Sequence, residues 1–346
     1  MLLPTLLLAS LPVGPSAEST LQDSAQVVDL IAFGSCARND RPQTIWPVIG
    51  GHEPDLFLFI GDNTYADLKR VPETAAEIQR AYDELEAVEG WRALRDQVPV
   101  LATWDDHDYG KNDAGVEWEL KAEAQRLFLD FYGVAADSPR RDREGIYHAE
   151  VFGPPGRRVQ VILLDTRYHR DPLTRKAERV RGRGPYTAGT GGTILGEEQW
   201  AWLEAQLSVP AELRILASSI QVVASEHGWE AWANFPHERA RLYRLLDDTN
   251  ANGVIAISGD RHLIELSCDR SRGAPYPFWD FTSSGLNEPE KPVAEPNAHR
   301  VGPVLRKASF GLIRVDWEAG VVTLEGRGVD DAVLLSQLVW LDRLRE

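Results

Sequence analysis

Residues 56–60 form a short apolar segment that ends in polar side chains suited to chemistry. Asp62, Asn63, Tyr65 and Asp67 follow it. A carboxylate and a phenol three residues apart can both bind a hard trivalent cation, because each supplies an anionic oxygen once the metal displaces its proton. The spacing therefore predicts a metal site. An Asx-type turn beside a buried tyrosine would give the same pattern without chemistry.

An apolar run followed by polar residues occurs six times along the chain. The runs are residues 27–33, 56–60, 98–103, 159–164, 213–217 and 253–257, and the groups that follow them include Cys36, Asp62, Asp105, Asp106, His107, Asp108, Asn112, Arg167, Gln221, Asp260 and His262. Helical patterns alternate with the runs, at residues 73–89, 117–132, 196–207 and 237–248. This alternation predicts an α/β fold with a largely parallel sheet, and we expect the polar groups to converge where its strands end.

The converging groups combine one thiol, at Cys36, with imidazoles, a phenol and many carboxylates. Carboxylates gathered at one sheet edge repel one another unless cations compensate their charge. Soft sulfur and hard oxygen favour different ions, so two unlike metals fit better than one tetrahedral zinc: a ferric centre and an oxygen-loving divalent ion. Without a metal, residues 104–113 would be a solvated acidic loop, and Asp260 and His262 a helix cap and a core histidine.

The charge balance excludes one class of partner. The 346 residues include 53 acidic and 37 basic side chains, a net charge of -16, and no Lys/Arg run is suited to a phosphate backbone. We therefore expect no nucleic acid partner. After the N-terminal segment no stretch is apolar for long enough to form a stable membrane span. No linker divides the chain, so residues 23–346 are predicted to form a single catalytic domain.

The N-terminus has the composition of a leader. Residues 1–22 contain a leucine-rich run followed by small residues, although no basic segment precedes the run. They are interpreted as a signal peptide or a disordered leader, and a signal would make the protein periplasmic or secreted. The alternative is a disordered tail after a misassigned start codon. Cys36 and Cys268 could pair in an exported chain, but the position of Cys36 after a strand favours a role in the site.

The remaining segments are predicted to surround the site or to extend the sheets. Residues 170–192 and 287–302 lack periodicity and are expected to be surface loops, the first as a lid or a substrate-contacting segment. Residues 309–326 are predicted to form a hairpin that completes a second sheet layer. Trp229, with Trp232 and Phe235, is a candidate apolar wall for a lipid or aromatic leaving group, although such clusters are more often core.

Four motifs, in this order, resemble those of the alkaline phosphatase D (PhoD-like) family of metallophosphoesterases. They are Gly34-Ser35-Cys36, Gly61-Asp62-Asn63-Thr64-Tyr65-Ala66-Asp67, Trp104-Asp105-Asp106-His107 with Asn112, and Ser258-Gly259-Asp260-Arg261-His262. The Gly-Asp-x-x-Tyr element also resembles purple acid phosphatases. The resemblance extends from about residue 27 to 317. It departs from larger members in having only 33 residues before Gly34, where they carry a β-domain, and in the sequence that precedes Asn112.

The resemblance implies a four-layer α/β/β/α sandwich with mixed, largely parallel central sheets. It also implies a dinuclear centre in which Asp62 bridges Fe3+ and Ca2+. The implied ferric ligands are Cys36, Tyr65 and His262, and the implied calcium ligands are Asp106, Asn112 and Asp260.

The implied reaction is hydrolysis of phosphate mono- or diesters by a metal-bound hydroxide. His107 would protonate the leaving group or orient the phosphate, Arg167 would stabilise the non-bridging oxygens, and Asn63 and Trp229 would contact substrate. A small phosphate ester or a phospholipid is the expected substrate, and a monomer the expected state. The alternatives are a catalytically silent phosphate-binding protein on the same fold and a zinc hydrolase of non-phosphate esters.

Overall fold

The computed structural model describes residues 26–289 and 291–345, and its strands form two mixed sheets. The first sheet contains β1 (Leu30–Gly34), β2 (Leu56–Ile60), β3 (Val100–Thr103), β11 (Ser309–Asp316), β12 (Val321–Gly328) and β13 (Val333–Trp340). The second contains β4 (His148–Phe152), β5 (Val159–Leu163), β6 (Leu213–Ser218), β7 (Val254–Ser258), β8 (Ile264–Asp269), β9 (Phe278–Ser283) and β10 (Arg300–Leu305). The predicted leader, residues 1–22, lies outside the described residues.

The centre of each sheet is parallel and the edges are antiparallel. The strand orders are β13-β12-β11-β1-β2-β3 and β10-β8-β9-β7-β6-β5-β4. Strands β1, β2 and β3 are parallel neighbours, as are β5, β6, β7 and β9. The six apolar runs therefore form strands or strand ends in two sheets, three runs in each, whereas the pattern suggested one sheet.

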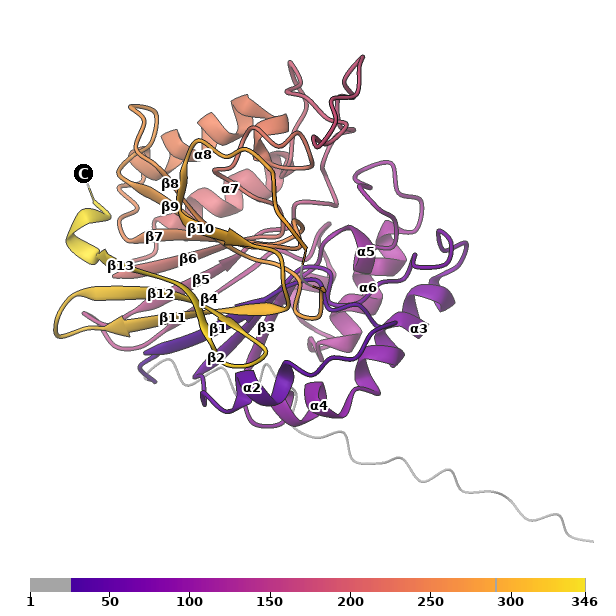
Figure 1. Cartoon of the computed structure of the whole chain (residues 1–346), viewed down its shortest axis with the longest axis horizontal. Helices are drawn as coiled ribbons and strands as arrows, with labels where there is room; N and C mark the ends of the chain where they lie inside the picture. The colour runs from indigo at the N-terminus through magenta and orange to yellow at the C-terminus, as the bar shows by residue number, and fades with distance from the viewer. Residues whose placement is uncertain (1–25, 290, 346) are drawn as a thin grey trace, which may run out of the picture.

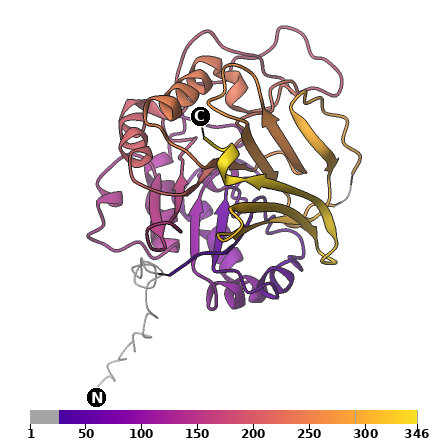
Figure 2. The same ribbon diagram turned by 90° about the vertical axis from the view of Figure 1, so that its left-hand side faces the viewer.

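Helices cover the outer face of each sheet (Figures 1 and 2). They are α2 (Trp46–Gly50), α3 (Ala75–Glu86), α4 (Glu89–Arg95), α5 (Asp106–Tyr109), α6 (Lys121–Phe131), α7 (Gly196–Leu207) and α8 (Pro236–Asp248), with 3-10 turns at Pro139–Arg141, Trp232–Asn234 and Leu341–Arg343. Figure 1 shows α7 and α8 over the second sheet and α2 and α4 below the first. This four-layer order confirms the predicted sandwich.

Strand β2 shows why the layers form. Leu56, Leu58 and Ile60 belong to the core between the two sheets, while Phe57 and Phe59 pack under the helices. All five are buried, because alternate side chains of a strand point to opposite faces and both faces are covered here. The uninterrupted apolar run thus correctly predicted a central strand.

Several elements differ from the predictions. The helical pattern at 73–89 belongs to α3 and the start of α4, and β10 begins within the segment 287–302 that was expected to be a loop. The hairpin of β11 and β12 is confirmed, and it extends the first sheet beside β1. Strands β8 and β9 were not predicted, because buried polar residues such as Glu265 and Asp280 interrupt their apolar pattern. Asp280 is satisfied by the backbone N–H groups of residues 222 and 223.

Two further features bear on the predictions. Cys36 and Cys268 are both buried and free, so the possible disulfide does not form. A search of the described helices finds none with the length and apolar character needed to cross a bilayer.

Candidate metal centre

The strand-end loops of both sheets meet at one place. The loops after β1, β2 and β7 carry Cys36, Asp62 and Asp260 with His262, and α5 after β3 carries Asp106. The first two loops are joined directly, since the Cys36 N–H donates to the Gly61 carbonyl at 3.2 Å. Residues far apart in sequence are thus side by side, as predicted for the carboxyl ends of parallel strands.

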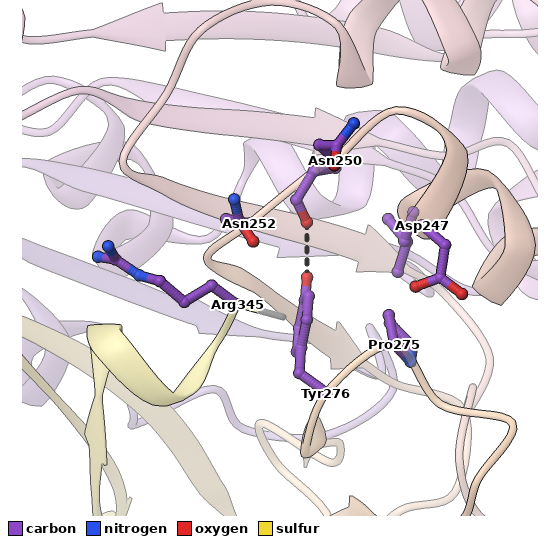
Figure 3. Close-up of a pocket in the computed structure, with 8 residues that line it drawn as sticks. Asp247, Asn250, Asn252, Pro275, Tyr276 and Arg345 are labelled. Atoms are coloured by element: carbon purple, nitrogen blue, oxygen red, sulfur yellow. Dashed lines mark hydrogen bonds between the residues drawn. The ribbon is translucent and has the colours of Figure 1, made fainter.

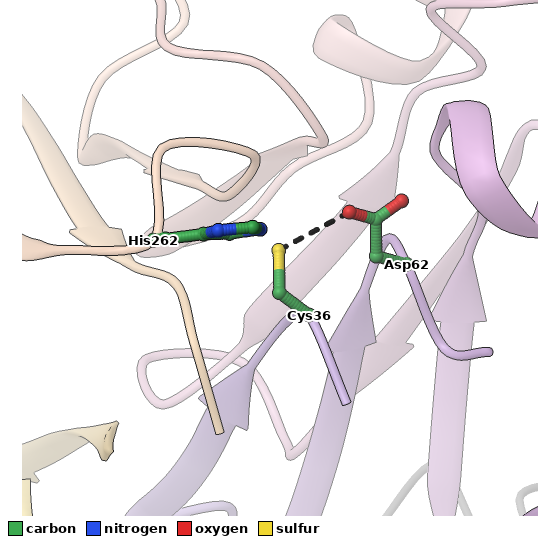
Figure 4. Close-up of side chains that lie close together, drawn as sticks. All are labelled: Cys36, Asp62 and His262. Carbon is green, nitrogen blue, oxygen red and sulfur yellow. Dashed lines mark hydrogen bonds between the residues drawn. The ribbon is translucent and has the colours of Figure 1, made fainter. Parts of the chain in front are cut away.

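One half of the site surrounds a single oxygen of Asp62. Oδ2 accepts hydrogen bonds from Cys36 Sγ at 3.3 Å and from the Tyr65 hydroxyl at 3.0 Å. Tyr65 also lies 3.2 Å from His262 Nε2. Figure 4 shows the thiol of Cys36 between the His262 ring and the Asp62 carboxylate, with the Cys36–Asp62 contact drawn dashed. Ligand atoms of Cys36, Asp62 and His262 lie within 4.8 Å of one another.

The other half of the site is carboxylate-rich. Asp62, Asp106 and His107 form a second group of potential ligands, and Asp105, Asp106 and Asp260 a third, each within 4.8 Å. Asp62 belongs to the first two groups and Asp106 to the last two. Asp62 is therefore placed between the two halves, where a bridging ligand would have to be.

The ionisation equilibria show how crowded these acids are. Burial raises the pKa of Asp62 and of Asp260 well above its ordinary value, and neighbouring aspartates raise it further. Burial likewise raises the pKa of the Cys36 thiol and the Tyr65 phenol, with Asp62 adding to both shifts. For Asp106, burial would raise the pKa, but the charges of His107 and Arg167 lower it.

The donor set fits bound cations. Among the aspartates of the site, three buried carboxylate oxygens have no hydrogen-bond partner in the described part of the chain: Asp105 Oδ2, Asp106 Oδ1 and Asp260 Oδ2. An unpaired buried carboxylate oxygen is costly, and a cation is the usual compensation. Thiol, phenol and imidazole on one side and carboxylates on the other suit two different ions.

The backbone at the site adopts conformations that side chains usually avoid. Positive φ angles occur at Cys36 (62°), Asp62 (48°), Asp113 (55°), Asp260 (63°) and His262 (51°), five of the eight such non-glycine residues described. Each left-handed residue costs roughly 1–2 kcal/mol. Such strain is concentrated at functional sites, where the surrounding structure holds it in place.

His107 is positioned by two neighbours. Its Nδ1 lies 2.5 Å from Asp67 Oδ1, and its ring stacks on Tyr65 with a centroid separation of 4.2 Å. Burial alone would lower the pKa of His107, but the charges of Asp106 and Asp62, with the Asp67 contact, raise it well above the ordinary value. The contact with Asp67 engages Nδ1 and leaves Nε2 as the ring nitrogen that could act on a substrate.

Arg167 does not occupy the predicted position beside a phosphate. Its side chain is fully buried, with Nε 2.5 Å from Asp105 Oδ1 and Nη1 2.6 Å from Glu230 Oε2. Arg170 contacts the other oxygen of Glu230 at 2.8 Å. The guanidinium is committed to this network, which orients Asp105, so we correct its role to positioning.

Asn63 and Asn112 also differ from the prediction. Asn63 is fully buried, and its Nδ2 donates to Asp108 Oδ2 at 2.7 Å and to the Thr103 carbonyl at 3.0 Å, so it ties two loops together instead of facing substrate. The side chain of Asn112 is exposed, and its backbone N–H donates to Asp67. The next residue, Asp113, forms a group of potential ligands with Asp106 and Glu230, within 4.8 Å of one another.

The proposed aromatic wall is reduced to one residue. Trp229 is 38% exposed and stacks against the Arg261 guanidinium at 5.0 Å, whereas Trp232 and Phe235 are core. The close spacing of these three aromatic residues in the sequence does not show which of them is exposed and which belong to the core.

Sequence reasoning missed several supporting residues. Glu288 is buried beside His262 Nδ1 at 3.6 Å, the Ser284 hydroxyl lies 3.1 Å from Cys36 Sγ, and Glu230 joins the Arg167 network. None of them follows an apolar strand-like run in the pattern that identified the others, so the sequence contained no usable signal for them.

A different pocket, of about 120 Å³, lies at the opposite ends of the strands (Figure 3). Asn250 and Asn252, which precede β7, line it together with Tyr276, whose hydroxyl donates to the Ala251 carbonyl at 2.8 Å. It is separated from Asp260 by the length of β7 and has no contact with the candidate metal centre.

The fold and the site together define an α/β sandwich protein with a candidate metal centre on its strand-end loops. A family model described as PhoD-like phosphatase matches residues 31–309. The chain therefore belongs to the PhoD-like phosphatase family, and the resemblance inferred from its four motifs is confirmed.

Individual relatives agree with this assignment. Alkaline phosphatase D of Bacillus subtilis (strain 168) is 26% identical over 227 residues, covering 56% of this chain and 38% of that protein. The chain thus matches less than half the length of this curated relative. A solved structure of PhoD superimposes with a TM-score of 0.72 at 17% identity, covering 92% of this chain and 69% of that one.

A second solved structure shares the fold at greater distance. GAP50, the anchor in the inner membrane complex of Plasmodium, has a TM-score of 0.57 at 13% identity, covering 92% of this chain and 89% of its own. Both identities are low, so these two structures support the fold alone.

Proposed function

We propose that this protein is a metal-dependent phosphoesterase that hydrolyses phosphate monoesters or diesters, including small phosphate esters and phospholipids. Membership of the PhoD-like phosphatase family supports a phosphoesterase. The proposal assigns Fe3+ to Cys36, Tyr65 and His262, and Ca2+ to Asp106 and Asp260, with Asp62 shared. Asn112 was expected in the calcium set, and Asp113, which lies in a group with Asp106, is a second candidate for that position.

One observation carries the proposal. A thiol, a phenol, an imidazole and several buried carboxylates from four strand-end segments converge, and oxygens of Asp106 and Asp260 lack partners among the described residues. A site that only stabilised the fold would satisfy these oxygens by hydrogen bonds. Bound cations would clamp a phosphate and make a water acidic enough to ionise near neutral pH.

The protein's own groups have defined tasks in this reaction. Asp62 is held with both oxygens engaged, Oδ2 by Cys36 and Tyr65 and Oδ1 by the His107 N–H at 3.2 Å. Protonated His107 donates its Nε2 proton to the leaving oxygen, because Asp67 holds Nδ1 and keeps the ring oriented. Arg167 does not contact the substrate in this proposal, and its role is to hold the Asp105 carboxylate in position.

The proposal also covers the location and state of the protein. Residues 1–22 have the composition of a signal, so we propose export to the periplasm or the medium, and we propose that the protein acts as a monomer. N-terminal sequencing and light scattering of the protein from its native compartment test these two points.

The test combines metal analysis with a single substitution. We expect purified protein to contain iron and calcium and to hydrolyse nitrophenyl phosphate mono- or diesters. Asp62→Asn removes the shared charge and should reduce kcat/KM by at least about 100-fold, whereas exposed Asp83→Asn should not change it. Unchanged turnover in Asp62→Asn would contradict the site. Zinc alone, without iron or calcium, would favour a hydrolase of other esters.

A further inference from the structure

A pocket of about 350 Å³ lies between the loop 170–192 and the segment 225–234. Its charged and aromatic lining consists of Lys176, Arg183 and Tyr186 from the loop, and Glu226, His227 and Trp229 from the segment. The backbone fixes these two segments to each other, since the N–H groups of Gly184 and Tyr186 donate to the carbonyls of His227 and Gly228, each at 2.8 Å. Its walls are therefore preformed.

The pocket adjoins the candidate metal centre through two of its walls. The Tyr186 hydroxyl donates to Asp113 Oδ2 at 2.5 Å. Asp113 in turn forms a group of potential ligands with Asp106 and Glu230. Trp229 stacks on Arg261, whose Nη1 is 3.7 Å from Asp260 Oδ2. Two chains of side-chain contacts therefore connect the lining of the pocket with residues of the candidate metal centre.

His227 lines the pocket and carries a buried hydrogen-bond donor that no described residue uses. Its side chain is 2% exposed, and Nδ1 accepts the Trp229 N–H at 3.0 Å. Burial lowers the pKa of His227 to about 3, with Arg261 and Lys176 adding to the effect, so the ring is neutral at neutral pH. A neutral ring that accepts at Nδ1 carries its hydrogen on Nε2. Nε2 has no partner among the residues described, which is uncommon for a buried donor.

The loop that forms one wall is basic in an acidic protein. Between residues 175 and 183 there are five cationic side chains, Arg175, Lys176, Arg179, Arg181 and Arg183, and one acid, Glu178, while the whole chain has a net charge of -16. Most other arginines pair with carboxylates, but no ion pair joins these five to any described residue. Lys176 Nζ donates to the Gly184 carbonyl at 3.0 Å and Arg183 donates to the Glu226 carbonyl, so the two cations of the lining are held by neutral acceptors and keep their net charge. Cations without a carboxylate partner beside a pocket attract an anionic ligand.

We propose that this pocket is a subsite for the leaving group and that the preferred substrate carries a second anionic group, a phosphate or a carboxylate, on that leaving group. The inference rests on the proposed phosphoesterase function. The Nε2–H of His227 and the ammonium of Lys176 bind the second anion. The exposed face of Trp229 contacts the carbon skeleton between the anion and the scissile phosphate.

Two matched substrates test this inference on the metal-loaded protein. They are 4-nitrophenyl phosphate and 3-carboxy-4-nitrophenyl phosphate, which differ in one carboxylate on the leaving group. We expect kcat/KM to be about tenfold higher for the carboxylated ester, since one charge-assisted hydrogen bond has roughly that effect. Lys176→Ala should abolish the preference. Arg179→Ala, an equal charge change outside the pocket lining, should retain it.

Two substitutions of His227 separate the donor from the rest of the ring. His227→Asn keeps an acceptor near the position of Nδ1 but removes the Nε2 donor, whereas His227→Gln places an amide donor near Nε2. We expect His227→Asn to lose the preference for the carboxylated ester and His227→Gln to keep part of it. Equal preferences in both variants and the wild type would overturn the role of His227.

Failure of this inference can be distinguished from failure of the proposed function. If both esters are hydrolysed at equal kcat/KM, or if Arg179→Ala loses the preference as Lys176→Ala does, the subsite is wrong and the phosphoesterase stands. If neither ester is hydrolysed, calorimetric titration with the leaving group alone, 5-hydroxy-2-nitrobenzoate, decides the subsite. Weaker binding in Lys176→Ala but not in Arg179→Ala supports it, and equal binding in all three proteins overturns it.

Discussion

Asp62 is the residue through which the two halves of the candidate metal centre meet. One carboxylate oxygen contacts Cys36 and Tyr65, and the other accepts the His107 N–H. Around it, a second ring of residues fixes the potential ligands: Asp67 holds His107, Ser284 contacts Cys36, and Glu288 lies beside His262. Such supporting contacts orient ligands before a metal binds and tune its affinity.

Glu288→Gln tests this second ring. Glu288 is 4% exposed and lies 3.6 Å from His262 Nδ1 and 2.8 Å from Arg41 Nη1. Loss of its charge should leave the fold intact and weaken metal binding by about 10–100-fold, because the ring is no longer held in one orientation. Competition with a chelator measures the affinity. Glu197→Gln, which breaks an exposed pair with Arg241, is the control, and equal affinities in both variants would contradict the assignment.

His227 makes stability depend on pH. Burial lowers its pKa in the folded protein to about 3, whereas an unfolded histidine titrates near 6.5. Between these values only the unfolded chain binds the proton. The stabilisation is therefore complete above pH 6.5 and is lost as the pH falls towards 3, by about 1 kcal/mol per pH unit.

Urea unfolding of the wild type and His227→Gln, between pH 7.5 and 5, isolates this contribution, because other titrating groups affect both proteins equally. We expect the difference between their free energies of unfolding to be constant above pH 7 and to shrink below 6.5. Parallel profiles over the whole range would show that His227 is protonated in the folded state or exposed to solvent.

At the scale of elements, the loops after the strands have to approach one another closely. Gly61 follows β2 with a φ of 114°, and a Cβ there would lie 2.7 Å from Asp105 Cβ and 3.0 Å from Ser219 Cβ. The buried network of Arg167, Asp105 and Glu230 then joins the loops after β3 and β5 to the segment before α8. These contacts keep the strained site backbone in place.

Gly61→Ala should therefore destabilise the protein through two effects, the left-handed backbone and the steric overlap. Gly320→Ala, at a hairpin turn with a φ of 66° and open space around it, reports the backbone effect alone, about 1 kcal/mol. We expect Gly61→Ala to cost at least about 1 kcal/mol more in denaturant unfolding. Equal costs would mean that the loops can move apart without loss.

At the scale of the whole molecule, the site exists because two sheets are stacked. Sheet one supplies Cys36, Asp62 and Asp106, and sheet two supplies Asp260 and His262. The core between the sheets holds them in register, with Phe33 of β1 packed edge-on against Phe281 of β9 at 5.0 Å. Bound metals would link the sheets a second time, across the strand-end loops.

Metal removal should therefore lower global stability. With free metal at 100 times its dissociation constant, binding adds about 2.7 kcal/mol to the free energy of unfolding, and a chelator removes it. Thermal unfolding with and without chelator measures the shift. Asp62→Asn should respond much less, and a wild type that is insensitive to chelator would contradict a metal shared between the sheets.

The sequence alone determined the local structure and most of the convergence. The run 56–60 predicted a doubly covered strand because five consecutive apolar residues leave no face for water, and α7 begins and ends where its pattern does. The predicted ligands Cys36, Asp62, Tyr65, Asp106, Asp260 and His262 follow strands whose parallel arrangement forces their ends together.

Only the tertiary structure decided which polar residues face the site and which support it. Arg167 and Asn63 follow strands as Asp62 does, but burial commits them to Glu230, Asp105 and Asp108. Whether a side chain turns inward or towards the opening depends on a partner distant in sequence. Residue order along one strand contains no record of that partner, which for Asn63 follows a neighbouring strand of the same sheet and for Arg167 follows a strand of the other sheet.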